Sequence, residues 1–276
     1  MSITAASARS ARAYLSYRPW PFFVQEYLRI MRSRLALLIW AMLLYALAAL
    51  PFLIAKPPPE VLHALGSWLG SEAVQAKLIL FMWVDAAMNK FAVILGPVLA
   101  GGIIAEERAR GTLDLLAAKP ISSSNYFTIK LAAAAAAFAT FYGAACIAAL
   151  LTFPWRIAGF DAADFVALSA VHVFAGLFAV TFSATMAVYF KRKLTGLLVS
   201  VAVLGTLVGV AFLGFYYPAY RTVSYFNPFF DGIVLIGSID DYGVVDVLFP
   251  ILLLVAFNLA ALMIGRRRAA YVLEEG

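Results

Sequence analysis

The sequence predicts an all-α integral membrane protein, and three observations lead to that fold class. Hydrophobic residues make up 64% of the 276 positions and charged residues only 13%, whereas average soluble domains carry roughly 25% charged residues. Several apolar stretches reach the roughly 20 residues that a helix needs to cross a bilayer core. The basic residues gather between and beyond these stretches. We therefore expect residues 1–276 to form a single transmembrane domain.

The N-terminal segment combines a basic tail with an amphipathic helix. Residues 1–18 contain arginines and no acid, which favours a cytoplasmic tail over an organelle-targeting peptide. In residues 21–34, Phe23, Tyr27 and Ile30 share one helical face, and polar residues occupy the other. This division is typical of a helix that lies in the membrane interface. A cytoplasmic extension of the next helix is the alternative.

Six apolar stretches follow, and helix breakers or basic clusters mark their ends. Pro57, Pro58 and Pro59 end the first stretch because proline interrupts a helix. Residues 191–193 separate the fourth from the fifth, and residues 266–268 close the sixth. The predicted spans are residues 35–54, 78–104, 127–153, 165–190, 194–217 and 245–264, with tails at 1–34 and 265–276.

The distribution of basic residues sets the predicted orientation. Most of the 21 lysines and arginines fall on the side that holds both termini, while Lys56, Lys77, Arg156 and Arg221 fall on the other. Cytoplasmic loops carry the excess of basic residues in membrane proteins. We therefore expect both termini to be cytoplasmic, and the net charge of +6 then needs no nucleic-acid partner.

One predicted cytoplasmic loop, within residues 101–130, has a polar pattern of its own. Gly111 and Thr112 can end one helix and cap another. Leu113 and Leu116 are three residues apart and would share a helical face, and Asp114 suits a helix N-terminus. The pattern predicts a short amphipathic helix on the cytoplasmic surface, which needs either lipid or another protein as a partner.

This loop resembles that of the permease subunits of ABC exporters of the second type. In those permeases an apolar helix end is followed, in order, by a Glu-Glu-Arg group, a Gly-Thr pair, leucines, a proline and a lysine. The resemblance covers about 30 residues in detail and the whole chain in layout. The matching residues are Glu106, Glu107, Arg108, Gly111, Thr112, Leu113, Leu115, Leu116, Pro120 and Lys130.

The resemblance implies a function and partners. Two permease subunits, as two copies or as close paralogues, would pair with two cytoplasmic ATPase subunits in a prokaryotic plasma membrane. A coupling helix at about 110–119 would dock on the ATPase, although a solvated cluster that only sets topology is the alternative for the charged residues. The residues assigned to docking are Glu106, Glu107, Arg108, Arg110, Gly111, Thr112, Leu113, Asp114, Leu116 and Pro120.

The chain contains no Gly-x-x-x-x-Gly-Lys-Ser/Thr phosphate-binding loop. We therefore expect it not to be an enzyme, and we expect ATP and magnesium to bind the partner ATPase. The chain has two histidines, so a His-rich metal site is excluded, and its one cysteine, Cys146, excludes an intrachain disulfide.

Polar residues inside the predicted spans are candidates for function. Asp85, Asn89 and Lys90 lie in the second span, where charged residues usually face protein or water. They would line a translocation path or a dimer interface, or lie in the outer headgroup region if the span begins later. His172 in the fourth span is expected to bond to a neighbouring helix rather than to a ligand.

Residues 218–244 are too aromatic for a solvated loop and too interrupted for a span. We expect a re-entrant segment, since irregular backbone at membrane depth must be buried in protein. The resemblance implies an outer gate within 225–236; an aromatic interfacial anchor is the alternative. Asp231, Asp240, Asp241 and Asp246 would form a solvated acidic rim. The candidate gate residues are Tyr225, Phe226, Asn227, Pro228, Phe229 and Phe230.

Two other function classes were weighed. An ATP-independent secondary transporter is the main alternative, although we find no repeat between the two halves of the chain such as those transporters often carry. An intramembrane enzyme would need a nucleophile and a base within reach of each other, and no residue pattern suggests such a pair.

Overall fold

The computed structural model describes residues 19–55, 74–104, 121–157, 159–190, 192–211, 213–238 and 241–274. Within these ranges the regular secondary structure is helical, with no strand. Six helical segments are long and apolar enough to cross a membrane. The predicted all-α class with six candidate spans is therefore confirmed. The spans lie in α3 (Arg34–Ala55), α5 (Val74–Phe81) continued by η1 (Met82–Asn89) and α6 (Lys90–Ala100), α9 (Ser123–Thr152), α10 (Ala162–Tyr189), α11 (Lys193–Ala211) and α15 (Val244–Glu274).

Shorter helices connect or flank the spans. α2 (Pro19–Met31) precedes the first span, and a 3₁₀ turn, η2 (Phe153–Trp155), ends the third. Five short pieces fill the connection between the fifth and sixth spans. They are α12 (Leu213–Tyr216), η3 (Pro218–Tyr220), α13 (Arg221–Ser224), α14 (Pro228–Ile233) and η4 (Val234–Ser238).

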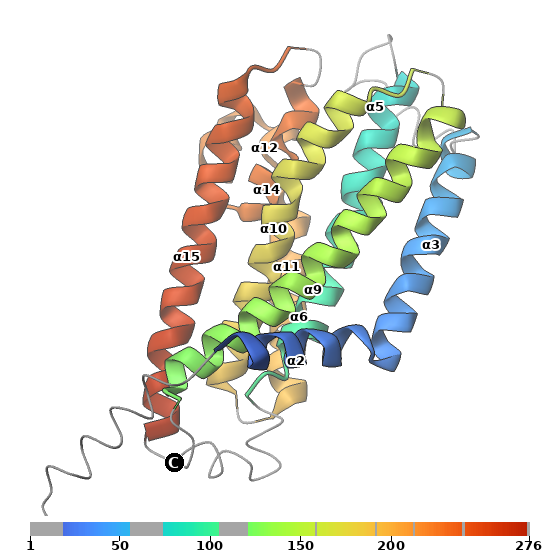
Figure 1. Ribbon diagram of the computed structural model, residues 1–276. Coiled ribbons are helices and arrows are strands. Elements are labelled where there is room, and N and C mark those ends of the chain that lie inside the picture. Colours follow the sequence, from blue (N-terminus) through green and yellow to red (C-terminus); the bar gives the residue numbers. More distant parts are fainter. Residues whose placement is uncertain are drawn as a thin grey trace, which may run out of the picture.

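Helix α10 forms the centre of the bundle. It packs against α6, α9, α11, α14 and α15 (Figure 1). Within an apolar stretch of 18 residues, 61% of the residues of α10 are buried inside the protein, against 17% of those of α15. Small residues allow this central position. A Cβ added at Gly96 of α6 would lie 2.8 Å from the carbonyl carbon of Ala179, so only glycine permits this approach of α6 to α10.

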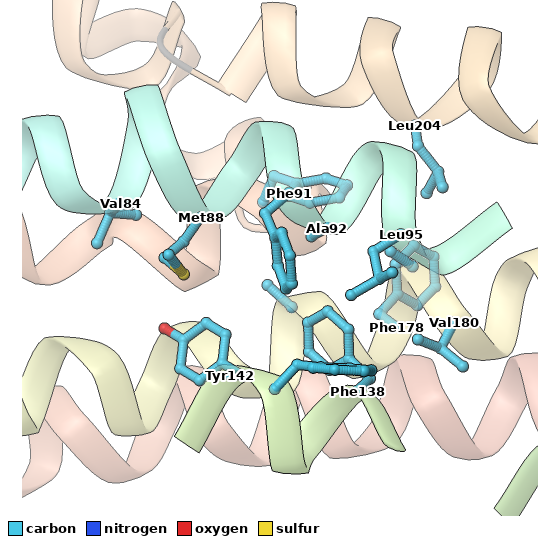
Figure 2. Packing of buried hydrophobic residues seen from close by; sticks show 14 of the residues in the cluster. Val84, Met88, Phe91, Ala92, Leu95, Phe138, Tyr142, Phe178, Val180 and Leu204 are labelled. Atoms are coloured by element: carbon cyan, nitrogen blue, oxygen red, sulfur yellow. The ribbon is translucent and has the colours of Figure 1, made fainter. Parts of the chain in front are cut away.

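An aromatic layer fills the space between α6, α9 and α10. The rings of Phe91 and Phe138 lie 6.1 Å apart, and those of Phe138 and Tyr142 lie 5.9 Å apart. Figure 2 shows these rings between the helices, with Leu204 reaching in from α11. Lipid tails are as apolar as these rings, so van der Waals packing rather than removal from water stabilises the layer. Offset and edge contacts between the rings are favourable, so the layer helps to fix the positions of the three central helices.

Helix α2 runs across one end of the bundle, roughly at right angles to the spans (Figure 1). Its Tyr27 hydroxyl lies 3.0 Å from that of Thr140, and the Phe22 ring lies 5.5 Å from that of Tyr126. Glu26 forms an ion pair with Lys130 at 3.9 Å. Part of the apolar face predicted for an interfacial helix is thus used to contact α9, while no residue of α2 is fully buried.

The largest difference between a predicted span end and an observed helix end is in the sixth span. α15 continues through Arg266–Arg268 to Glu274, ten residues past the predicted end at 264, because arginine is a good helix former and Arg268 stacks over the rings of Tyr189 and Tyr271 at 5.3 and 5.4 Å. In the fifth span, α11 is described to Ala211 and α12 from Leu213 to Tyr216, so together they reach one residue short of the predicted end at 217, and residue 212 lies outside the described part of the chain.

Candidate functional site

The predicted docking loop cannot be placed, since residues 105–120 lie outside the described part of the chain. All ten residues assigned to docking fall there, from Glu106 to Pro120, so their role remains a prediction. The flanking structure is described. A turn at residues 101–104 follows α6, and Ser122 caps α9 by accepting a hydrogen bond from the backbone N–H of Asn125 at 3.4 Å. The loop therefore connects directly to α6 and α9.

The second span contains an unusual helical geometry. Residues Met82–Asn89 form a π-helix, in which residue i bonds to i+5 rather than i+4. This geometry brings side chains five residues apart onto one face. The Lys90 ammonium donates to the Asp85 backbone carbonyl at 3.0 Å and to its carboxylate Oδ2 at 3.3 Å. The separation of five residues, which suits an α-helix poorly, therefore supports an ion pair here.

A chain of hydrogen bonds leads from this ion pair into the core. The Asn89 amide donates to Asp85 Oδ1 at 3.5 Å, and its Oδ1 lies 2.8 Å from His172 Nε2. His172 Nδ1 lies 3.1 Å from the Tyr142 hydroxyl. Asn89 and His172 are fully buried, and Tyr142 is 2% exposed. We call the set Lys90, Asp85, Asn89, His172 and Tyr142 the polar chain; it joins η1 and α6 to α10 and α9.

The hydrogen bonds of the polar chain from His172 to Asp85 point the same way. The Asn89 side-chain oxygen can only accept, so Nε2 of His172 must carry the proton that it donates. With a neutral ring, Nδ1 carries no proton and accepts from the Tyr142 hydroxyl, whose single proton also lies within reach of the Ser169 backbone carbonyl at 3.3 Å. The bonds from His172 to Asn89 and from Asn89 to Asp85 therefore run toward the carboxylate, which also receives the Lys90 ammonium, while the Tyr142 proton is shared between His172 and Ser169. An amide does not pass protons on readily, so this arrangement orients side chains and braces helices rather than conducting protons.

The ion pair opens onto a groove between α3 and the second span. The groove has a volume of about 490 Å³ and apolar walls, with Met42, Tyr45, Leu50, Met88 and Phe91 among the lining residues. Lys90 also lines it, and its side chain is 59% exposed. Lys90 precedes Ala100 by ten residues, roughly 15 Å at 1.5 Å per residue, which is about half the bilayer core. An exposed cation is therefore found near the middle of a candidate span.

A second cavity lies beside α2. It has a volume of about 310 Å³ and is bounded by α2, the end of α6 and the starts of α9 and α11. Glu26, Arg29, Lys130 and Lys193 bring charge to it, and Gly102 and Ile103 form another wall. In the sequence, Lys130 belongs to the motif shared with the exporter permeases, while Arg29 and Lys193 belong to the basic residues on the side predicted to be cytoplasmic. Their convergence at this end of the bundle arises from α2 folding back over α9.

The segment between the fifth and sixth spans is packed into the bundle. Asn227 accepts from the backbone N–H of Phe229 at 3.0 Å, which caps α14, and donates to the Leu207 carbonyl at 2.7 Å. Phe229 and Phe230 are buried, and the Tyr225 ring lies 5.2 Å from that of Phe230. Phe226 instead is 77% exposed. The structure thus unites the candidate gate residues except Phe226, which points away.

Asp231 does not belong to a solvated rim, contrary to the prediction. It is completely buried in α14, and neither carboxyl oxygen has a hydrogen-bond partner within the described chain. It lies outside the six candidate spans. Burial without a partner disfavours the charged form and raises the pKa of the Asp231 carboxyl to about 8. The rim interpretation fits Asp246 better, since that residue is exposed and caps the start of α15 through the Gly243 N–H.

Of the polar side chains in the core, the sequence analysis missed Tyr142 but gave the correct expectation for His172. Tyr142 drew no attention because a tyrosine within an alanine-rich span looks like any other aromatic residue. His172 was expected to bond to a neighbouring helix, and this is confirmed. Asn258 behaves in the same way: it donates to the Phe174 carbonyl at 3.1 Å and accepts from the Thr181 hydroxyl at 3.0 Å. The isolated polar residues in these apolar helices therefore link α10 to its neighbours.

Comparison with known proteins adds no relative: no family model matches the sequence, and no curated protein matches it.

Proposed function

We propose that this chain is the transmembrane permease subunit of an ATP-driven ABC exporter, which works as a pair of permeases with two cytoplasmic ATPase subunits. The observation that carries the proposal is the polar pattern of residues 101–130, placed between the second and third of six candidate spans. Helix α2, packed across one end of the bundle, adds the amphipathic element expected beside such a loop. ATP and magnesium would bind the partner.

The two helices that flank the loop could transmit a displacement of the loop to the rest of the bundle. The loop begins after α6 and ends at the start of α9, so a displacement of its helix would pull on both. α6 lies in close contact with α10 at Gly96, and the polar chain ties η1, which precedes α6 in the same span, to α10. In this account, closure of the ATPase pair brings the loops together and shifts the population of bundle states.

The groove beside Lys90 is the proposed path or contact with a second permease. A cation exposed near mid-membrane costs roughly 2.5–3.5 kcal/mol on translocon-insertion scales unless it faces protein or water. Lys90, which is paired with Asp85, lines the α3 groove, whose other walls are apolar. A second copy or an aqueous path over this groove would remove that cost. The chain would then reside in a prokaryotic plasma membrane with both termini in the cytoplasm.

Docking can be tested with two double variants that add the same charge at the cytoplasmic surface. Leu113→Asp with Leu116→Asp places two acids on the predicted docking face. Ser122→Asp with Asn125→Asp places two acids at the exposed start of α9, where aspartate still caps the helix. Each tagged chain is purified from its native membrane in mild detergent, and the co-eluting ATP hydrolysis is measured.

The docking proposal predicts that ATPase subunits and ATP hydrolysis co-elute with the wild-type chain and with the Ser122/Asn125 variant. Both should be lost with the Leu113/Leu116 variant while membrane insertion is retained. Equal ATP hydrolysis in all three would contradict docking through this face. If no ATPase accompanies the wild-type chain and the purified chain alone carries a gradient-driven flux, it is a secondary transporter.

A further inference from the structure

Among the described acids of the outer segment, Asp231 is the one that is completely buried, and neither the proposed docking nor the proposed path uses it. It belongs to α14, a helix of six residues, all of them buried. Both carboxyl oxygens lack a hydrogen-bond partner in the described chain. Burying an isolated carboxylate is far more costly than burying a neutral acid, so the packed segment accommodates the protonated form.

The neighbours of α14 offer this carboxyl little charge. α14 packs against α10, α11, α15 and η4. α10 presents His172, which is neutral in the polar chain, while the other titratable residues of α10, Asp164 and Tyr189, lie near its ends. α11 has only Lys193 at its far end, and η4 has no titratable residue. α15 has Asp246 in its first turn, and Asp246 lines an outer cavity together with Arg221 and Tyr225. The arginines of α15 begin only at position 266. No ion pair connects Arg221 to Asp231 among the described contacts.

The contact between α14 and α10 is close and depends on a glycine next to Asp231. A Cβ added at Gly232 would lie 2.8 Å from Ala175 Cβ and 3.3 Å from His172 Cδ2. The α14 backbone therefore rests on the part of α10 that holds the polar chain. Two connections limit how far α14 can move as a unit: the Asn227 bond to Leu207 on α11, and the short connection through η4 to α15.

We propose that Asp231 is a proton-binding site, and that the bound proton holds α14 packed against α10 so that proton release frees the outer segment. The charged carboxylate gains hydration when α14 leaves its position, whereas the neutral acid gains little. Burial raises the pKa of Asp231 to about 8, while a hydrated aspartate titrates near ~3.9. The proposal concerns the outer segment alone and holds whether or not an ATPase drives the bundle.

The sign of the pH dependence follows from these two values. Below pH ~4 the carboxyl is protonated in both the packed and the released state, so packing is at its most favourable. Between pH ~4 and ~8 the released state is ionised and the packed state is not, so the packed population relative to the released one falls by up to about tenfold per pH unit. Above the packed-state pKa both are ionised, and the ratio becomes constant.

The test follows the accessibility of a buried position on α14. In full-length chains with Cys146→Ala, held in lipid nanodiscs, Ile233→Cys reports release because Ile233 is buried, and Phe226→Cys reports an exposed site of the same segment. A charged thiol reagent is applied from pH 5 to pH 9. Dividing the labelling rate of Ile233→Cys by that of Phe226→Cys removes the intrinsic pH dependence of the thiol.

The expected ratio rises by up to about tenfold per pH unit and levels off near pH 8. With Asp231→Asn, a neutral side chain of the same shape, the ratio should stay low and flat. A flat ratio in the wild-type background would overturn the proposal, and so would an equal rise with Asp231→Asn. If the asparagine variant does not insert, infrared spectra of the wild-type chain with isotope-labelled aspartate decide instead. Loss of a protonated carboxyl band near pH 8 supports the proposal, and its absence at pH 5 contradicts it.

Discussion

Two buried polar features of the bundle, the polar chain and Asp231, meet the cost of burial in opposite ways. In the polar chain, each polar side chain that reaches the core is bonded to a neighbour, and the charge of Asp85 is matched by Lys90. Asp231 has neither a hydrogen bond nor a counter-charge in the described chain. Its neighbour in the sequence, Gly232, nevertheless lies against His172 of the polar chain. The two features therefore have different consequences for the stability of the helices that carry them.

The difference separates a fixed region from a movable one. A satisfied network orients its members and resists change, because breaking any one bond leaves a buried group without a partner. A lone buried acid destabilises the packed state once it ionises, because the charge has neither water nor a partner. We therefore expect α6, α9 and α10 to move together, and α14 to be the element whose position responds to conditions.

The largest effect is expected from breaking the charge balance of the polar chain. Asp85→Asn keeps the shape but leaves the Lys90 ammonium without its carboxylate, which should cost about 3 kcal/mol of stability in the membrane. Thermal unfolding in nanodiscs, followed by size-exclusion chromatography, measures the loss.

Adding Lys90→Gln to Asp85→Asn is the matched control, because it removes the stranded charge and should restore most of the stability. A single variant as stable as the wild type would mean that Lys90 is hydrated in the groove and that the ion pair is not needed.

A smaller effect is expected where α14 meets α10. Gly232→Ala places a methyl group 2.8 Å from Ala175 Cβ, and such overpacking typically costs about 1–3 kcal/mol. Because α14 can move away, the change should appear as faster labelling of Ile233→Cys at pH 5 rather than as loss of the bundle.

Gly209→Ala is the control for that substitution, since a Cβ at Gly209 would meet no other atom within 4 Å. Its labelling should match that of the wild type. If Gly232→Ala instead unfolds the whole protein, α14 is as fixed as α10 and the comparison between the two regions fails.

The smallest effect is the coupling between Asn89 and His172 inside the polar chain. Hydrogen bonds between membrane helices average about 0.6 kcal/mol and reach about 1.7 kcal/mol in double-mutant cycles. The cycle Asn89→Leu, His172→Leu and the double variant should give a coupling energy in this range. A coupling near zero would show that the 2.8 Å contact does not hold η1 to α10.

Sequence analysis anticipated the helical class and the number of candidate spans because apolar length is a direct physical requirement of the bilayer. It did not anticipate the π-helix at Met82–Asn89, since the apolar residues there fit an ordinary helix. The five-residue separation of Asp85 and Lys90 suits an ion pair poorly in an ordinary helix, so the pair could not be expected without this geometry.

The interpretation of Asp231 was wrong for a related reason. An acid between two apolar spans looks like part of a solvated loop, and only the packing of α14 against four other elements shows that water does not reach it. The aromatic residues around it did predict a segment packed into the protein, and the burial of Phe229 and Phe230 fits that prediction. The composition of a segment therefore indicates whether the segment is buried, while the burial of single polar side chains depends on contacts between distant segments.

The most direct test of the account is the side of the membrane that each of two positions faces. The docking loop must meet an ATPase on one side, and the exposed part of the outer segment, which includes Phe226, must face the opposite side. In intact cells carrying Cys146→Ala, Asn125→Cys and Phe226→Cys each report one end of the bundle, because both native side chains are exposed. The account predicts that an impermeant thiol reagent labels Phe226→Cys from outside and reaches Asn125→Cys only in inverted vesicles. Labelling of Asn125→Cys from outside intact cells would contradict it.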